Sequence, residues 1–258
     1  MATPSSPARK KSPLRTAATL VVPMLMGAAV GALGAHYFPD MLPDTDFTAA
    51  QKVLTGVVLV ALALAAIAVH EAGHLLGGRL AGFRALLFVV GPFRVERTGA
   101  GCRAGLNRNA MIAGGLAVSV PEDTRALRPR TLLMVAGGPG TSVLAGALAL
   151  VLREPLGLAQ LPPGAGYGRA LAAVSLVVFG MLSLGIGAAT LVPARTGGFY
   201  SDGAPILRLL RSGPDTDREV ALLALLAHSM GGRRPREWDP ALVAQSLAAA
   251  DGTPFDAV

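Results

Sequence analysis

Long apolar segments without charge constrain this chain more than any other feature of its sequence. Four of them occur, at residues 16–38, 53–69, 131–152 and 170–192. Each approaches the roughly 20 residues that a helix needs to cross about 30 Å of hydrocarbon. A fully buried helix of a soluble protein can have the same composition, but four such segments among 258 residues favour membrane spans. We therefore predict an all-α polytopic membrane protein with about four transmembrane helices.

The distribution of charge predicts the orientation of these spans. A net charge of +7 can indicate nucleic-acid binding, but 20 of the 23 Lys and Arg residues lie before the first span, between the second and third, or after the fourth. The other two loops hold only Lys52, Arg153 and Arg169. By the positive-inside rule, both termini and the central loop are cytoplasmic. We expect an integral multi-pass protein of a bacterial inner (plasma) membrane, in contact with the lipid bilayer and with no nucleic-acid partner.

The predicted chain divides into three regions. Residues 1–15 are rich in Pro, Ser and basic residues and are expected to form a disordered cytoplasmic tail. Residues 16–211 form the membrane domain, whose first span is retained because it lacks the small-x-small cleavage site of a signal peptide. Residues 212–258 contain two helical patterns and form a small cytoplasmic appendage. Including the residues that continue each helical pattern, the predicted spans cover residues 16–38, 53–80, 131–152 and 168–192.

Short β-prone segments follow the second span. Two of them flank Gly91-Pro92, a turn signal that predicts a membrane-associated β-hairpin. Residues 114–120 form a further extended segment that ends at Pro121. Within the third span, Gly137-Gly138-Pro139-Gly140 is typical of close helix packing or of a kink.

Two histidines at the end of the second span indicate a metal centre. His70 and His74 are four residues apart, so on a helix they project from the same face. Two imidazoles placed in this way can bind one Zn²⁺, with Glu71 beside them as the general base. Ionisable side chains inside an apolar span are costly and are typical of a functional site.

A hydrolytic zinc site needs a third protein ligand. His36 lies near the outer end of the first span, His228 lies in the C-terminal region, and Cys102 lies in a basic loop. Asp202 follows the fourth span, which returns the chain to the face where the two histidines lie, and Gly203 permits close backbone approach. We predict Asp202 as the third ligand; the alternative is an ordinary Asp-Gly turn.

The motif His70-Glu71-Ala72-Gly73-His74, followed by Asp202-Gly203, resembles the site-2 protease family of intramembrane zinc metalloproteases. That family carries H-E-x-x-H on one membrane helix and a third ligand from an N-x-x-P…L-D-G segment on a later one. Residues 114–118 are similar to the family's G-x-V substrate-binding loop, and Gly138-Pro139 resembles its G-P motif. The resemblance covers residues 53–211. It implies a zinc endopeptidase, a compact variant without a PDZ or CBS domain, that cleaves in or near transmembrane segments of other membrane proteins.

The resemblance also implies a set of substrate-binding residues, namely Gly115, Leu116, Ala117, Val118 and Thr190. Three features depart from the family pattern. Thr190 and Ser142 each stand where the family usually or often has Asn, and the segment from Thr190 to Asp202 is longer than usual.

Two other classes of function remain open from the sequence. A metal transporter would use the same histidines, but it needs a polar path, and the other spans contain almost no ionisable residues. A catalytically silent scaffold would be consistent with the missing Asn, but not with four intact site residues.

Overall fold

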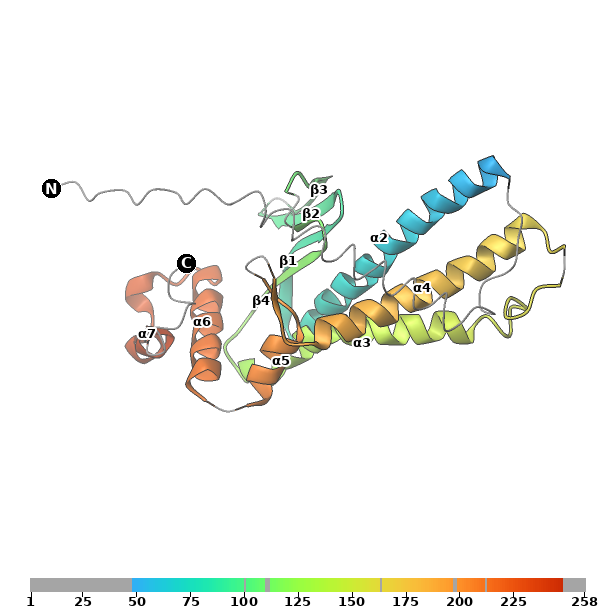
Figure 1. Cartoon of the computed structure of the whole chain (residues 1–258). Coiled ribbons are helices and arrows are strands. Elements are labelled where there is room, and N and C mark those ends of the chain that lie inside the picture. The colour runs from blue at the N-terminus through green and yellow to red at the C-terminus, as the bar shows by residue number, and fades with distance from the viewer. Residues whose placement is uncertain are drawn as a thin grey trace.

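The computed structural model describes residues 48–99, 101–109, 112–162, 164–196, 199–211 and 213–247. Its architecture is mostly helical, with three long helices that lie side by side (Figure 1): α2 (Ala49–Leu80), α3 (Leu127–Val151) and α4 (Tyr167–Leu191). Each is long and apolar enough to cross a membrane. They correspond to the second, third and fourth predicted spans. The first predicted span, the N-terminal tail and His36 lie outside the described residues.

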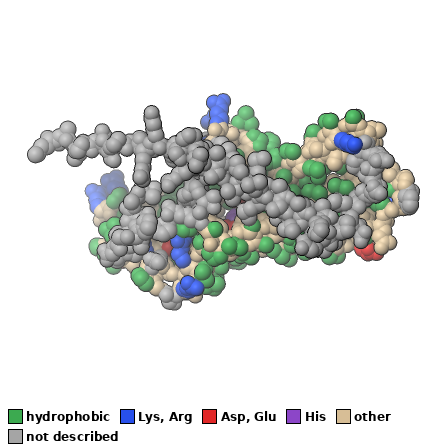
Figure 2. Space-filling model, in the orientation of Figure 1, with side chains coloured by type: hydrophobic (Ala, Val, Ile, Leu, Met, Phe, Trp, Pro, Cys, Tyr) green, Lys and Arg blue, Asp and Glu red, His purple; other side chains and the backbone are tan. Residues whose placement is uncertain are grey.

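The outer surfaces of these helices are apolar. Val57 and Val60 on α2, and Leu144 and Leu148 on α3, are each more than half exposed. Figure 2 shows hydrophobic side chains over the visible surface of the helices, whereas most of the visible Lys and Arg side chains lie over the end that carries the sheet and the C-terminal helices. Apolar side chains that face outward on α2 and α3, together with three helices of spanning length, indicate a membrane protein.

Glycines allow α2 and α3 to pack closely. A Cβ added to Gly73 would lie 2.4 Å from the carbonyl oxygen of Gly137, and one added to Gly137 would lie 3.3 Å from the Cα of Gly77. Any side chain at these positions would separate the two backbones. The Gly-rich segment of the third span therefore serves close helix packing, as the sequence predicted.

A four-stranded antiparallel sheet lies at one end of the helices, in the strand order β3-β2-β1-β4. Its strands are β1 (Phe83–Val90), β2 (Phe93–Thr98), β3 (Gly101–Leu106) and β4 (Leu116–Pro121). The Val90 and Phe93 pair closes the predicted hairpin around Gly91-Pro92, and β4 matches the predicted extended segment. The mostly helical fold therefore contains the predicted hairpin and extended segment as parts of one four-stranded sheet. Strand β3 was not predicted, because its sequence contains two glycines and no β-branched residue.

Arg130 joins this sheet to the helices. Its guanidinium donates to the carbonyl oxygens of Ala81 (2.5 Å) and Gly82 (2.8 Å), in the turn between α2 and β1. It also donates to Asp123 Oδ1 at 2.5 Å and to the Arg125 carbonyl oxygen at 2.7 Å, in the loop before α3. One side chain therefore ties together the two connections that orient the sheet. Asp123 is the acidic partner in this cluster.

The C-terminal part of the chain follows α4. A two-stranded hairpin, β5 (Arg195–Thr196) and β6 (Phe199–Tyr200), leads to the short helix α5 (Gly203–Leu210). Helices α6 (Pro214–Met230) and α7 (Pro240–Leu247), separated by a 3-10 turn at Pro235–Glu237, correspond to the two predicted helical patterns. Helix α6 packs against α7 and β4.

Candidate metal centre

Three predicted site residues converge where α2 meets α5. His70 Nε2 lies 3.0 Å from Asp202 Oδ2, and His74 Nε2 lies 3.3 Å from Asp202 Oδ1. The two Nε2 atoms are 3.2 Å apart. His70 is buried, and the other two side chains are partly buried. Their potential ligand atoms all lie within 4.8 Å of one another, an arrangement that could hold a metal ion.

The opposite nitrogen of each imidazole has its own partner. His70 Nδ1 lies 2.9 Å from the hydroxyl of Ser142, and His74 Nδ1 lies 3.2 Å from the carbonyl oxygen of Met134. Both partners belong to α3, so this helix sets the orientation of both rings. Metal-binding histidines almost always have such a partner, because it fixes the tautomer and directs the other nitrogen to the metal.

These contacts determine which atoms the site presents. The carbonyl oxygen of Met134 only accepts hydrogen bonds, so Nδ1 of His74 carries a hydrogen and Nε2 of the neutral ring presents a lone pair. That lone pair faces His70 and the carboxylate of Asp202. Groups that all present negative density repel one another unless a proton or a metal cation lies among them. The residues present therefore fit a metal ion bound by two nitrogens and one carboxylate, the donor set of catalytic zinc sites.

Asp202 reaches the histidines because the segment before it is closed on itself. The Ser201 amide donates to the Ala194 carbonyl oxygen (3.0 Å), and the Ser201 hydroxyl donates to the Val192 carbonyl oxygen (2.6 Å). These bonds bring the two ends of the β5–β6 hairpin together at the end of α4, so Asp202 lies close to that helix end. A Cβ added to Gly203 would lie 1.9 Å from the Leu191 carbonyl oxygen, so glycine is required there. This closure accommodates the unusually long segment between Thr190 and Asp202.

Ser201, which directly precedes the start of α5, does not cap this helix. Asp202 occupies the N-cap position, and neither it nor Ser201 makes a side-chain cap hydrogen bond. The Ser201 hydroxyl instead fastens the hairpin, and the Asp202 carboxylate is directed to the histidines. Burial raises the pKa of the Asp202 carboxyl, but the contacts with the imidazoles of His70 and His74 lower it by more. The net pKa lies below the usual range for aspartate, so this group is an anionic ligand.

Glu71 lies between the cluster and the start of β4. Its carboxylate interacts electrostatically with both imidazoles and with Asp202, and the Ala117 backbone amide donates a hydrogen bond to it. Gly115 has φ +116°, and a Cβ added to it would lie 2.3 Å from Glu71 Oε1. Both its backbone angle and this contact require glycine. The predicted glycine-containing loop is therefore adjacent to the predicted general base.

The remaining predicted residues differ in their placement. Leu116 and Val118 lie in β4 next to Ala117 and pair with β1. Thr190 directs its hydroxyl to the carbonyl oxygen of Gly187 (3.4 Å), within its own helix. His228 lies on α6, and Cys102 is exposed on β3; neither belongs to the cluster.

Three further residues shape the site without being predicted as site residues. Ser142 and Met134 orient the rings, and Gly138 leaves room for one of them. A Cβ added to Gly138 would lie 2.2 Å from His74 Nε2. The sequence points to Gly138 through the resemblance to the G-P motif, and to Ser142 only through a departure from the family pattern. Met134 contributes a backbone carbonyl, for which no sequence signal exists.

No family model, curated protein or solved structure matches the chain. The chemistry of the site is therefore inferred from its own residues.

Proposed function

We propose that this protein is an intramembrane zinc endopeptidase that hydrolyses peptide bonds in or near transmembrane segments of other membrane proteins. The observation that carries the proposal is the convergence of His70, His74 and Asp202 next to Glu71, with the histidines and Glu71 on a helix apolar enough to span a membrane. Two imidazoles and one carboxylate leave a fourth position open, as catalytic zinc sites do. A structural zinc site would instead have four protein ligands.

Each residue of the site has a defined role in this proposal. His70, His74 and Asp202 bind Zn²⁺, and Ser142 and the Met134 carbonyl hold the two rings in orientation. Zn²⁺ would polarise the scissile carbonyl and make water acidic enough to react near neutral pH. Glu71 accepts a proton from the attacking water on its carboxylate and then delivers that proton to the leaving amine.

Strand β4 supports a mode of substrate binding. It is an edge strand of the sheet, and it begins beside Glu71. A transmembrane helix has its carbonyl groups hydrogen-bonded internally, so it must unwind before a peptide bond can be attacked. An extended peptide can add to the edge of a sheet through main-chain hydrogen bonds. We propose that residues 115–118 hold the substrate in this way.

Replacing Glu71 by Gln tests the mechanism. The variant keeps all three proposed zinc ligands but loses the proton acceptor. We expect cleavage of a reconstituted single-span membrane substrate to fall by at least about 100-fold, while bound zinc stays unchanged. The measurement is the product yield in proteoliposomes, together with the zinc content of the same sample. A variant that cleaved at a rate near that of the wild type would contradict the proposal.

A Glu71→Gln variant is also suited to identifying the substrate. It should form a complex with the substrate without cleaving it, so that a membrane protein retained by the variant and cleaved by the wild type can be identified by mass spectrometry. A metal transporter would yield no cleaved protein in this comparison. A silent scaffold would retain the same partners in both forms.

A further inference from the structure

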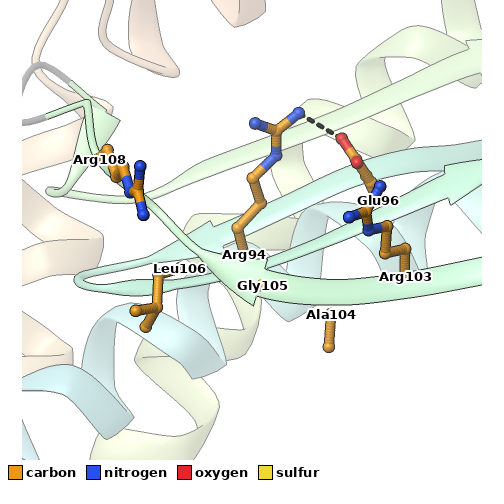
Figure 3. Close-up of a pocket in the computed structure, with 7 residues that line it drawn as sticks. All are labelled: Arg94, Glu96, Arg103, Ala104, Gly105, Leu106 and Arg108. Atoms are coloured by element: carbon orange, nitrogen blue, oxygen red, sulfur yellow. Dashed lines mark hydrogen bonds and ion pairs between the residues drawn. The ribbon is translucent and has the colours of Figure 1, made fainter.

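The ribbon formed by β2 and β3 has two chemically different faces. Side chains alternate between the faces along each strand, and cross-strand partners share a face. Phe93 pairs with Leu106 and Val95 pairs with Ala104, so one face is apolar near the turn, and Arg97 and Cys102 continue that face at the far end of the ribbon. Phe93 is 59% exposed and Leu106 is 70% exposed. In Figure 3, Leu106 and Ala104 point to one side of the ribbon, while Arg94, Glu96 and Arg103 stand on the other.

A pocket lies on the polar face, with a volume of about 340 Å³. Arg94, Arg103 and Arg108 line it, together with a single acidic residue, Glu96 (Figure 3). Glu96 forms an ion pair with Arg94. Within the described part of the chain, Arg103 and Arg108 have no acidic partner at ion-pair distance. The pocket therefore carries an excess of two positive charges.

No side chain of Gly105 occupies this pocket. Gly105 lines it opposite Arg94, and a Cβ added to Gly105 would meet no atom within 4 Å. Three guanidinium groups surround a space that no side chain of the ribbon fills. Guanidinium groups bind phosphate and carboxylate through pairs of parallel hydrogen bonds. The pocket thus has the charge and the donors that an oxyanion needs.

The position of the ribbon indicates which kind of oxyanion the pocket would bind. At the hairpin turn, a Cβ added to Gly91 would lie 2.6 Å from the Leu64 side chain, midway along the apolar helix α2. The exposed Phe93 and Leu106 lie next to this turn. The ribbon therefore begins beside apolar helix surface and carries arginines on its opposite face. The turn and its apolar side chains therefore fit the acyl-chain region, and the arginine stems on the opposite face can extend their charge toward headgroup phosphate.

We propose that Arg94, Arg103 and Arg108 form a binding site for the headgroup phosphate of an anionic phospholipid, with Phe93, Val95 and Leu106 against its acyl chains. The site is separate from the metal centre and shares no residue with it. A bound lipid would hold the ribbon against the membrane. It would thereby also fix the position of the sheet, which carries β4.

Native mass spectrometry of the full-length protein, released from detergent, tests this proposal. Phosphatidylglycerol and phosphatidylcholine with identical acyl chains are titrated separately, and the dissociation constant of the first bound lipid is measured. We expect phosphatidylglycerol to bind at least about tenfold more tightly than phosphatidylcholine. Arg103→Gln and Arg108→Gln should each weaken phosphatidylglycerol binding by about fivefold and leave phosphatidylcholine binding unchanged.

Arg97→Gln is the matched control, because Arg97 is exposed on the same ribbon and outside the pocket. It should change phosphatidylglycerol affinity by less than about twofold. A loss equal to that of Arg103→Gln would mean general charge attraction and would overturn the assignment. Equal affinity for the two lipids would overturn it as well. Inorganic phosphate alone, if it bound as tightly as phosphatidylglycerol, would assign the pocket to a free anion instead of a lipid.

Discussion

At the scale of single residues, Ser142 is the position whose role most needs the structure to be understood. It is fully buried, and its hydroxyl contacts the nitrogen of His70 that faces away from Asp202. Without this contact the ring loses the partner that holds its orientation. We expect Ser142→Ala to weaken zinc binding by roughly 10- to 100-fold, the usual effect of removing such a partner. A competition titration with a zinc chelator measures this affinity.

Ser183→Ala serves as the control for that substitution. Ser183 is also fully buried, on α4, and its hydroxyl has no hydrogen-bond partner in the described part of the chain. The Ser183→Ala substitution removes the same kind of hydroxyl group from a buried position that does not contact a histidine. Equal zinc affinity of the two variants would show that Ser142 fills space and does not orient His70.

Residues of the site also separate what the sequence could predict from what it could not. The spacing of His70 and His74 predicted that both lie on one helix face, and α2 places them so, with Glu71 beside them. Asp202 was predicted by elimination and by topology, and its carboxylate lies against both rings. Ser142 was not assigned a role, because its contact with His70 joins positions 72 residues apart. Contacts between helices depend on packing, which periodicity does not encode.

At the scale of elements, Arg130 determines how the sheet is held against α2 and α3. It donates to carbonyl groups on both connections and pairs with Asp123. Hydrogen bonds that involve a charged group contribute about 1.5–3 kcal/mol each to stability. We expect Arg130→Gln to lower the melting temperature of the detergent-solubilised protein by several degrees, on the order of 5 °C. Arg233→Gln, exposed in the turn after α6, should leave it within about 1 °C.

That experiment has a clear contrary outcome. If both arginine variants had the melting temperature of the wild type, the orientation of the sheet would depend on strand pairing and helix contacts alone.

The prediction of elements from sequence succeeded where a strong local signal exists, as at Gly91-Pro92 and in the three apolar helices. It failed for β3 and for the β5–β6 hairpin, since pairing with a neighbouring strand stabilises both and neither has a distinctive sequence pattern.

At the scale of the whole molecule, the distribution of basic residues predicts that the sheet is cytoplasmic. Cys102 is exposed on β3 and is the only cysteine of the chain, so it reports on this directly. A membrane-impermeant thiol reagent should label Cys102 in intact cells only after permeabilisation. In a Cys102→Ser background, a Lys52→Cys variant, at the opposite end of α2, should be labelled without it. Labelling of Cys102 from outside would reverse the proposed orientation.

The metal content of the purified protein tests the central claim most directly. Elemental analysis should find about one zinc per chain in the wild type and in Glu71→Gln, because both keep three ligands. Asp202→Ala, which removes the only charged ligand, should lose most of its zinc and all proteolysis. Asp217→Ala, which changes an exposed acidic residue on α6 outside the metal centre, should retain both. If Asp202→Ala kept a full complement of zinc, or if the wild type bound none when zinc was supplied, the assignment of this site as a zinc peptidase centre would be wrong.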